Sequence, residues 1–319
     1  MYYIGIDLGG TNIKAGVVDE TGRILTEAYT KTLARRPYED IVRDMGACVN
    51  MAISSAKVPV EGVASIGIGI PGLADAQSGR VVFCTNLGWH DIPLREEMQK
   101  YLDRPVVIDN DATVAGYAES IAGVSQGCDC SVFLTLGTGT GGGIVIGGRP
   151  WTGMHGIGSE IGHMTLAADG VPCTCGNEGC VERYTSATAI IRMARELCLT
   201  YPDSMMMQRA GGDIDRINAK TVIDAAKAGD PAATEAFDRY CRYLAMTINN
   251  IIALLDPDMI VLGGGVSHAG EFLLRKVREK LPRFLLYKNM PYARLELARL
   301  GNDAGIIGAA MIGKLAVEL

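Results

Sequence analysis

The sequence predicts an α/β protein of two domains with a metal-binding loop in its second half. Short apolar runs typical of buried strands alternate with longer segments of helical period, which is the pattern of α/β folds. At 319 residues the chain is long for a single hydrophobic core. The strand-and-turn plan of the first half also recurs in the second half, which indicates a weak internal duplication.

The first half opens on a strand, a glycine-rich turn and a second strand. Residues 3–6 lead into the turn at 7–11, after which Ile13, Ala15 and Val17 alternate with polar or small residues. A dinucleotide-binding turn and a Walker loop both open a helix, so neither motif fits this context. The remaining expected elements are a strand at 23–25, a helix at 37–56, a strand at 63–70, a loop through 79–87, a helix at 94–101 and a strand at 106–108.

The second half repeats this plan around another Gly/Thr turn. A strand at 132–136 leads into the turn at 137–141 and a further strand at 144–146. The segment 301–304 echoes 110–112, since each follows an apolar run with polar residues and an alanine. The other expected elements are strands at 259–262 and 295–300 and helices at 186–199, 221–227, 231–255 and 304–317.

Composition excludes several classes of partner. Thirty basic and 36 acidic residues give a net charge of −6 without a Lys/Arg run, so we expect no nucleic-acid partner. The chain opens on strand-like residues and holds no apolar run of membrane-spanning length. We therefore expect a cytoplasmic protein without a membrane anchor. Cysteines such as Cys48 and Cys241 have scattered spacings that suggest reduced thiols rather than a disulfide framework.

The segment from Gly158 to Glu182 combines four potential metal ligands. Three thiolates and one imidazole complete a tetrahedral shell, which suits Zn²⁺ and leaves no position for a reactive water. We therefore predict a structural zinc rather than a catalytic one. The predicted ligands are His163, Cys173, Cys175 and Cys180.

Two carboxylates flank these ligands, and a metal site alone does not require them. Glu160 precedes the cluster and Glu182 follows it, so the metal loop would hold both side chains in place. Carboxylates are hydrogen-bond acceptors, as polyhydroxylated ligands require, although Glu182 also fits a solvated surface position. His163 can serve twice, with one ring nitrogen on zinc and the other donating to a ligand hydroxyl.

The two Gly/Thr turns are suited to hold phosphates through backbone N–H groups and threonine hydroxyls. Asp7 beside the first turn is a candidate for Mg²⁺, bound directly or through water. Either turn alone would be an ordinary hairpin turn, but the pair, with the glycine run at 263–265, favours a nucleotide. The predicted nucleotide-binding residues are Asp7, Gly9, Gly10, Thr11, Asn12, Gly137, Thr138, Gly139 and Gly264.

Asp111 is the candidate general base. A carboxylate at a strand end can accept the proton of a substrate hydroxyl as that oxygen attacks a phosphoryl group. The competing interpretation is an Asx turn or a helix cap before Ala112. The neighbouring Asn110 adds a hydrogen-bonding group suited to a sugar hydroxyl.

Six motifs in this order resemble the ROK family of bacterial sugar kinases and sugar-responsive repressors, and most closely its ATP-dependent glucokinases. They are IGIDLGGTNIK, the PG pair at 71–72, NDA at 110–112, LGTGTGGGI, GSEIGHM and CTCGNEGCVE, and the resemblance covers essentially the whole chain. It implies two ribonuclease-H-like domains of the actin and hexokinase type with a cleft between them. The smaller lobe would comprise 1–112 and 305–319, and the larger one 113–304.

The same resemblance implies an ATP- and Mg²⁺-dependent kinase that phosphorylates the 6-hydroxyl of glucose, and a homo-oligomer such as a dimer. Asp111 would be the base and His163 with the three cysteines would bind zinc. The residues implied to bind the sugar are Asn110, Asp111, Glu160, His163 and Glu182, together with Gly79, Arg80 and Thr85.

Other hexose kinases, regulators and sugar-binding proteins are the alternative functions. Substrates such as N-acetylmannosamine, N-acetylglucosamine, allose, mannose or fructose differ from glucose at individual hydroxyls, which the sequence does not resolve. Regulators of this family place a DNA-binding module ahead of the first phosphate turn, and Asp7 already begins that turn here. A sugar-binding or zinc-scaffold protein would be expected to lack Asp111 or one Gly/Thr turn. We therefore expect a hexose kinase, most plausibly a glucokinase.

Overall fold

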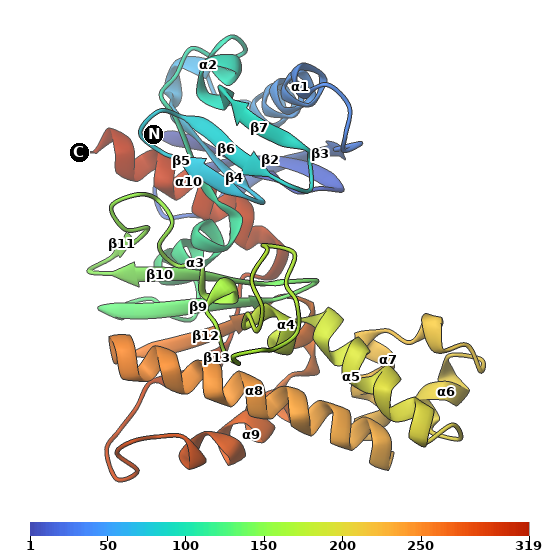
Figure 1. Ribbon diagram of the computed structural model, residues 1–319. Helices are drawn as coiled ribbons and strands as arrows, with labels where there is room; N and C mark the ends of the chain where they lie inside the picture. The colour runs from blue at the N-terminus through green and yellow to red at the C-terminus, as the bar shows by residue number, and fades with distance from the viewer. Residues whose placement is uncertain (319) are drawn as a thin grey trace. The chain divides into compact units, whose positions relative to one another are not determined.

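In the computed structural model, which describes residues 1–318, the chain has an α/β fold built on mixed sheets (Figure 1). It divides into two compact units, and each is described by itself. Unit 1 consists of Met1–Phe133, Gly143–Ser159 and Arg299–Leu319. Unit 2 consists of Leu134–Gly142 and Glu160–Ala298.

The central sheet of unit 1 has the strand order β3-β2-β1-β4-β8. β1 pairs antiparallel with β2 and parallel with β4, and β8 pairs parallel with β4. The predicted strands are therefore present, although the third is longer than expected because it follows β2 along its full length. The strands are β1 (Tyr2–Leu8), β2 (Asn12–Asp19), β3 (Ile24–Lys31), β4 (Val63–Ile70) and β8 (Val106–Asn110).

Helices cover both faces of this sheet. α1 (Tyr38–Ala56) buries Ile41, Met45 and Val49 against the face formed by the even-numbered residues of β1, and α2 (Leu94–Gln99) joins the same core. The opposite face packs against α3 (Asp111–Ala122) and α10 (Ala304–Val317). The helices predicted at 37–56 and 304–317 are thus confirmed.

α10 lies directly on the backbone of the sheet because glycines face it. A Cβ atom added at Gly5 would overlap the carbonyl of Ile306, and one added at Gly67 would overlap the carbonyl of Ala309. Gly308 on the helix is equally crowded by the carbonyl of Val114 in α3. Small residues at these positions therefore set how closely helix and sheet approach each other.

The second five-stranded sheet has the order β11-β10-β9-β12-β13. When the strands of each five-stranded sheet are numbered in chain order, both sheets follow the order third, second, first, fourth, fifth, which agrees with the predicted duplication. Two boundaries were wrong: the strand expected at 144–146 already starts at Thr140, and the one expected at 295–300 ends at Leu297. The strands are β9 (Cys130–Leu136), β10 (Thr140–Ile146), β11 (Arg149–Pro150), β12 (Met259–Gly263) and β13 (Arg294–Leu297).

A layer of helices completes unit 2 around α8 (Pro231–Leu255), against which α5, α7 and α9 pack. Its start and end agree with the prediction: the Asp230 side chain caps the first turn, and Asp256 ends the helix in a left-handed conformation before Pro257. The others are α4 (Glu182–Thr185), α5 (Ala187–Thr200), α6 (Met205–Arg209), α7 (Ala219–Lys227) and α9 (Glu271–Lys280).

Some elements differ from the sequence expectation. The loop expected through 79–87 belongs to a three-stranded antiparallel sheet of β5 (Leu73–Asp75), β6 (Arg80–Cys84) and β7 (Trp89–Ile92). Helix α3 was not predicted. Its buried positions surround much of the helix and leave no clear apolar stripe. Within residues 1–318, no helix has both the length and the apolar character needed to cross a bilayer.

Two aspartates lie on one face near the carboxyl end of the first sheet, with β4 between them. Asp7 of β1 lies opposite Gly69 of β4, and Gly69 lies opposite Asp109 of β8, so all three share one face. Burial raises the pKa of Asp7, an effect that Lys14 partly offsets. Burial also raises the pKa of Asp109 to about 6, against the lowering effect of the hydrogen bond from the Asn110 amide.

The glycine contact beneath α10 predicts that Gly67→Ala destabilises the protein by about 1–3 kcal/mol or more, since the new methyl group overlaps helix backbone that cannot move alone. Gly69→Ala in the same strand is the matched control, because its Cβ would meet only Val114 side-chain atoms at 3.5–3.6 Å. Urea unfolding of both variants measures the difference. Equal stability of the two variants would contradict this account of the packing.

The raised pKa of Asp109 predicts that the stability of the protein depends on pH. The pKa of Asp109 is higher in the folded protein than in the unfolded chain. Its contribution to the unfolding free energy is therefore complete below pH ~4 and is lost as pH rises through about 6. The loss is at most about 3 kcal/mol, at about 1.4 kcal/mol per pKa unit. Asp109→Asn should remove this component, so the variant gains stability relative to the wild type between pH 4 and 7. If the unfolding free energies of the wild type and Asp109→Asn change with pH in the same way, this account of Asp109 is wrong.

Candidate functional site

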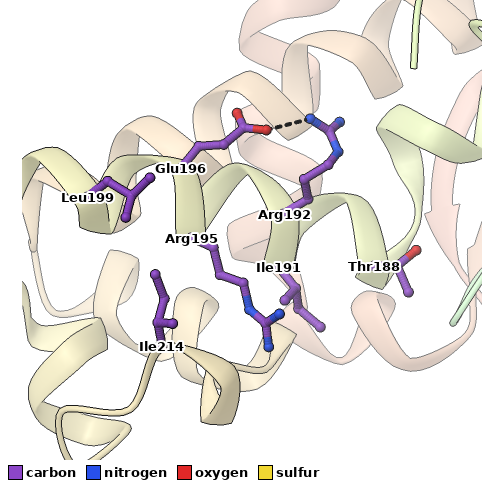
Figure 2. Close-up of a pocket in the computed structure, with 7 residues that line it drawn as sticks. All are labelled: Thr188, Ile191, Arg192, Arg195, Glu196, Leu199 and Ile214. Carbon is purple, nitrogen blue, oxygen red and sulfur yellow. Dashed lines mark hydrogen bonds and ion pairs between the residues drawn. The ribbon is translucent and has the colours of Figure 1, made fainter. Parts of the chain in front are cut away.

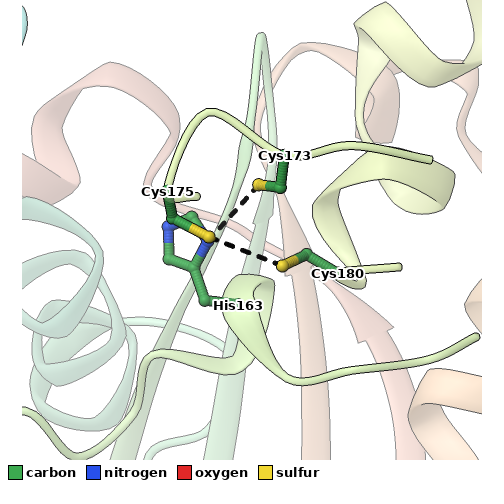
Figure 3. Close-up of side chains that lie close together, drawn as sticks. All are labelled: His163, Cys173, Cys175 and Cys180. Carbon is green, nitrogen blue, oxygen red and sulfur yellow. Dashed lines mark hydrogen bonds between the residues drawn. The ribbon is translucent and has the colours of Figure 1, made fainter. Parts of the chain in front are cut away.

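The four predicted metal ligands of unit 2 come together although they belong to separate segments (Figure 3). His163 ends a 3-10 turn, and the three cysteines lie on the loop that leads to α4. The four ligand atoms all lie within 4.8 Å of one another. Cys175 Sγ is 3.6 Å from Cys180 Sγ, and Cys173 Sγ is 3.8 Å from His163 Nδ1.

This donor set fits a tetrahedral metal ion. With metal–sulfur bonds of about 2.3 Å, ligand atoms at the corners of a tetrahedron are about 3.8 Å apart, close to the separations found here. Burial raises the pKa of Cys180 to about 12, with Cys175 and Cys173 adding to the effect, so a cation is needed to hold this group as thiolates. His163 would bind through Nδ1 and keep Nε2 for another partner.

Glu182 links the metal loop to the Gly/Thr turn of the second sheet. Its Oε2 accepts a hydrogen bond from the Thr140 amide at 3.1 Å, and its Oε1 lies 4.0 Å from Cys173 Sγ. Gly139 has no room for a Cβ because this carboxylate occupies the space. The metal loop and the turn therefore share one carboxylate.

Glu160 lies just before the metal ligand His163 on the same segment. Its surface is exposed, yet the surrounding protein desolvates its carboxyl group and raises its pKa; His163 lowers the pKa and Glu182 raises it. The charges of Glu182 and His163 therefore act on Glu160 within unit 2.

The second Gly/Thr turn is held at the start of α5. The Ala187 amide donates to the Gly137 carbonyl at 2.7 Å, and the Thr188 hydroxyl donates to the Thr138 carbonyl at 2.9 Å. Gly264 packs against the backbone of Leu136, where a Cβ would be 2.7 Å from the nearest atom. The predicted nucleotide residues Gly137, Thr138, Gly139 and Gly264 are therefore neighbours in unit 2.

Asn110 and Asp111 lie at the junction of β8 and α3 in unit 1. The helix-cap interpretation weighed for Asp111 applies instead to Asn110, whose side-chain oxygen accepts from the amides of Ala112 (2.9 Å) and Thr113 (3.3 Å). Its Nδ2 donates to the Gly72 carbonyl at 3.1 Å. Asp111 is the first helical residue, exposed, and its Oδ1 accepts from the Ala112 amide at 2.8 Å.

The first glycine turn, which contains Asp7, Gly9, Gly10, Thr11 and Asn12, closes between β1 and β2. The Gly9 amide donates to the Asn12 carbonyl at 3.0 Å, and a Cβ at Gly10 would lie 3.6 Å from Asn86. The predicted Thr85 precedes Asn86, so this turn and the loop after β6 are adjacent within unit 1.

Gly79 and Arg80 have other partners. Gly79 packs against the Arg95 side chain, and the Arg80 guanidinium binds the side chain and the carbonyl of Asp91 in the small sheet. Their predicted sugar-binding role stays a prediction.

Sequence reasoning missed Asp109, Thr140 and Thr188. Asp109 precedes the NDA motif, and Asp7 on the same face of the sheet is distant in sequence. Thr140 and Thr188 act through contacts with Glu182 and Thr138 across 42 and 50 positions of chain. The only local signal was the Ser186 cap, which places Thr188 in the first turn of a helix.

Comparison with known proteins gives consistent results along the chain. The model of the ROK family matches residues 3–315. A glucokinase from Thermotoga maritima is 38% identical over 98% of this chain and 96% of its own length. An N-acetyl-D-glucosamine kinase from Salmonella paratyphi B is 33% identical over 98% and 99%, and a xylose repressor from Caldicellulosiruptor bescii is 28% identical over 96% and 76%.

Two solved structures are similar throughout. A ROK family glucokinase from Streptomyces griseus, in complex with glucose and AMPPNP, is 36% identical with a TM-score of 0.84, covering 99% of this chain and 100% of that one. A ROK hexokinase from Thermus thermophilus is 33% identical with a TM-score of 0.85, covering 100% and 99%. With the family matched from residue 3 to residue 315, this chain is a member of the ROK family.

Proposed function

We propose that this protein is an ATP-dependent glucokinase that transfers the γ-phosphoryl group of ATP to the 6-hydroxyl of glucose. The observation that carries the proposal is full-length similarity to glucokinases, one of which was solved with glucose and an ATP analogue. The exposed Asp111 at the start of α3 supplies a carboxylate suited to such a reaction.

Asp111 acts as the general base. Its carboxylate accepts the proton of the sugar 6-hydroxyl, the freed oxygen forms a bond to the γ-phosphorus, and the bond to the bridging oxygen breaks to release ADP. The hydrogen bond from the Ala112 amide and the helix start orient this carboxylate. Asn110, fixed as the cap of α3, has a second amide hydrogen available for a sugar hydroxyl.

The remaining sugar contacts come from Glu160, Glu182 and His163. Glu160 and Glu182 accept hydrogen bonds from sugar hydroxyls, and His163 donates through the ring nitrogen that does not bind the metal. The small-sheet residues Gly79, Arg80 and Thr85 contribute to the same sugar site. The predicted lobes, 1–112 with 305–319 and 113–304, stay part of this proposal.

The two Gly/Thr turns bind the nucleotide phosphates, and Asp7 would hold a Mg²⁺ ion, which would supply positive charge to neutralise them. His163, Cys173, Cys175 and Cys180 would hold a zinc ion, which would fix the loop before α4. The kinase would act in the cytoplasm as a homo-oligomer. These assignments accord with the ligand-atom spacing in unit 2 and with the motifs of each turn.

Another hexose is the alternative substrate, because an N-acetyl-D-glucosamine kinase is also similar along the whole chain. A regulatory role has less support, since the xylose repressor is only 28% identical. Steady-state kinetics with ATP and a panel of glucose, mannose, allose, fructose, N-acetylmannosamine and N-acetylglucosamine separates these cases. We expect the highest kcat/KM with glucose, and no turnover with any sugar would refute the kinase proposal.

Replacing the base should affect turnover more than binding. Asp111→Asn keeps the shape of the side chain but removes its proton acceptor, so kcat should fall about 10²- to 10⁴-fold with a smaller change in sugar affinity. Glu160→Gln is the comparison, because loss of a hydroxyl acceptor should weaken sugar binding at least as much as turnover. Near-normal kcat in Asp111→Asn would reassign the base.

Metal removal should inactivate the protein without unfolding most of it. A structural zinc contributes on the order of 10 kcal/mol to the order of its loop, while the two sheets keep their own cores. We expect about one zinc per chain, and loss of glucose phosphorylation with a native-like circular dichroism spectrum after Cys175→Ser. Cys198→Ser, on α5 outside the cluster, should retain the metal. Full activity in metal-free protein would contradict this role.

A further inference from the structure

Each compact unit has an open hollow on its surface. In unit 2 the hollow runs along α5 and is lined by Ile191, Arg195 and Ile214 (Figure 2). Thr188 at its end donates to the Thr138 carbonyl, which connects this hollow to the predicted phosphate turn. In unit 1 the hollow lies between β3 and α1 and has a volume of about 510 Å³. No residue that lines the hollow of unit 1 belongs to the site proposed above.

The hollow of unit 1 lies beside an edge strand. β3 is the end strand of the order β3-β2-β1-β4-β8, and within residues 1–318 only β2 pairs with it (Figure 1). Thr26 and Ala28 face α1, since the Thr26 hydroxyl donates to the Ala52 carbonyl at 2.8 Å and Ala28 packs against the core beneath that helix. An edge of this kind presents backbone N–H and C=O groups with which a further strand can pair.

The exposed side chains of β3 are nearly symmetrical about Tyr29, which is itself 76% exposed. Two residues away on either side stand opposite charges, and four residues away stand two leucines. A register shift against β2 near the first leucine and the left-handed φ of the second end the regular segment on both sides. The exposed residues in order are Leu25, Glu27, Tyr29, Lys31 and Leu33.

This symmetry makes β3 complementary to a second copy of itself. In an antiparallel pair that places Tyr29 opposite Tyr29 of the second copy, Glu27 of each chain faces Lys31 of the other. Two opposite-charge pairs therefore flank an aromatic pair. On the side of α1, Ala28 faces Thr30, so only small side chains lie beside the hollow.

The same charges disfavour other pairings. Registers centred on Glu27 or on Lys31 would place like charges opposite each other, which destabilises a strand pair. Charged side chains commonly protect an edge strand from indiscriminate pairing, and here their arrangement still permits the register centred on Tyr29. Lys31 donates to Asn12 Oδ1 at 2.9 Å and keeps two further ammonium hydrogens for a carboxylate.

We propose that β3 is the docking edge for a second copy of this chain, which adds its own β3 in the antiparallel register centred on Tyr29. The two central sheets then continue into one another. Side chains of the second copy fill the hollow, where the exposed Met51 of α1 supplies apolar surface. The proposal rests on the proposed function only for the expectation of a homo-oligomer, and not for the kinase reaction.

Charge reversal tests the pairing, with sedimentation equilibrium of the full chain as the measurement. Glu27→Lys alone, or Lys31→Glu alone, turns both cross-strand pairs into like charges. The dimer dissociation constant should then rise at least about fourfold, because each of two pairs loses an attraction and gains a repulsion. An equimolar mixture of the two variants restores opposite charges in both pairs, so it should form heterodimers with nearly the wild-type constant, as should the double variant with itself.

A cysteine on the symmetry axis tests the register. Residues opposite each other in an antiparallel pair have Cα atoms about 4.5–5.5 Å apart, within the range of about 4.4–6.8 Å found in disulfides. Tyr29→Cys should therefore give a disulfide-linked dimer under mild oxidation. Glu27→Cys is the matched control, because its two copies would be four positions out of register, about 13 Å apart, and should link no more than the wild type.

Melting temperatures verify that each variant is folded. A wild type that stays monomeric at every concentration overturns the proposal, as does a dimer whose dissociation constant is the same in both charge variants. Equal cross-linking of Tyr29→Cys and Glu27→Cys would contradict the register. A monomer that phosphorylates glucose would contradict this proposal alone, whereas a β3-linked dimer without turnover of any hexose would contradict the kinase proposal alone.

Discussion

The hydrogen bond from the Thr140 amide to Glu182 connects two parts of unit 2 that carry predicted ligand-binding residues. It joins the Gly/Thr turn to a loop that has little apolar support of its own, since 174–178 is exposed throughout. In the proposed function, a metal ion bound by His163 and the three cysteines would hold that loop in place of a hydrophobic core. Movement of the metal loop would therefore displace the turn, because the Glu182 carboxylate contacts both segments.

In unit 1, a helix is held close to the sheet because glycines replace larger residues at the contact. Gly5 and Gly67 allow α10 to rest on the backbone of β1 and β4, and the helix begins where Gly305 packs against Asp7. The position of Asp7 is thus set by a helix from the other end of the sequence. A tight backbone contact tolerates little adjustment, which suits a residue expected to position a metal ion.

Patterns within short stretches were predicted well from the sequence. α8 could be placed to the residue because Asp230, the apolar stripe and Asp256-Pro257 all act locally. The four ligands could be grouped because three of them lie within eight positions. The small sheet of β5–β7 and the contact from Thr188 to Thr138 could not be predicted, since distant pairing determines them. Asn110 shows a third case, in which the motif was found but a helix cap was considered only for its neighbour Asp111.

The crossing of α10 back onto the first sheet has a consequence for synthesis. Ribosomes release the chain from its amino end, and domains generally fold as units once their residues have emerged. Unit 2 is complete at Ala298, whereas unit 1 needs Arg299 and the residues after it. The amino-terminal sheet must therefore wait, with its glycine-lined face uncovered, while the later unit closes first. The part of the protein that is made first is the last to be finished.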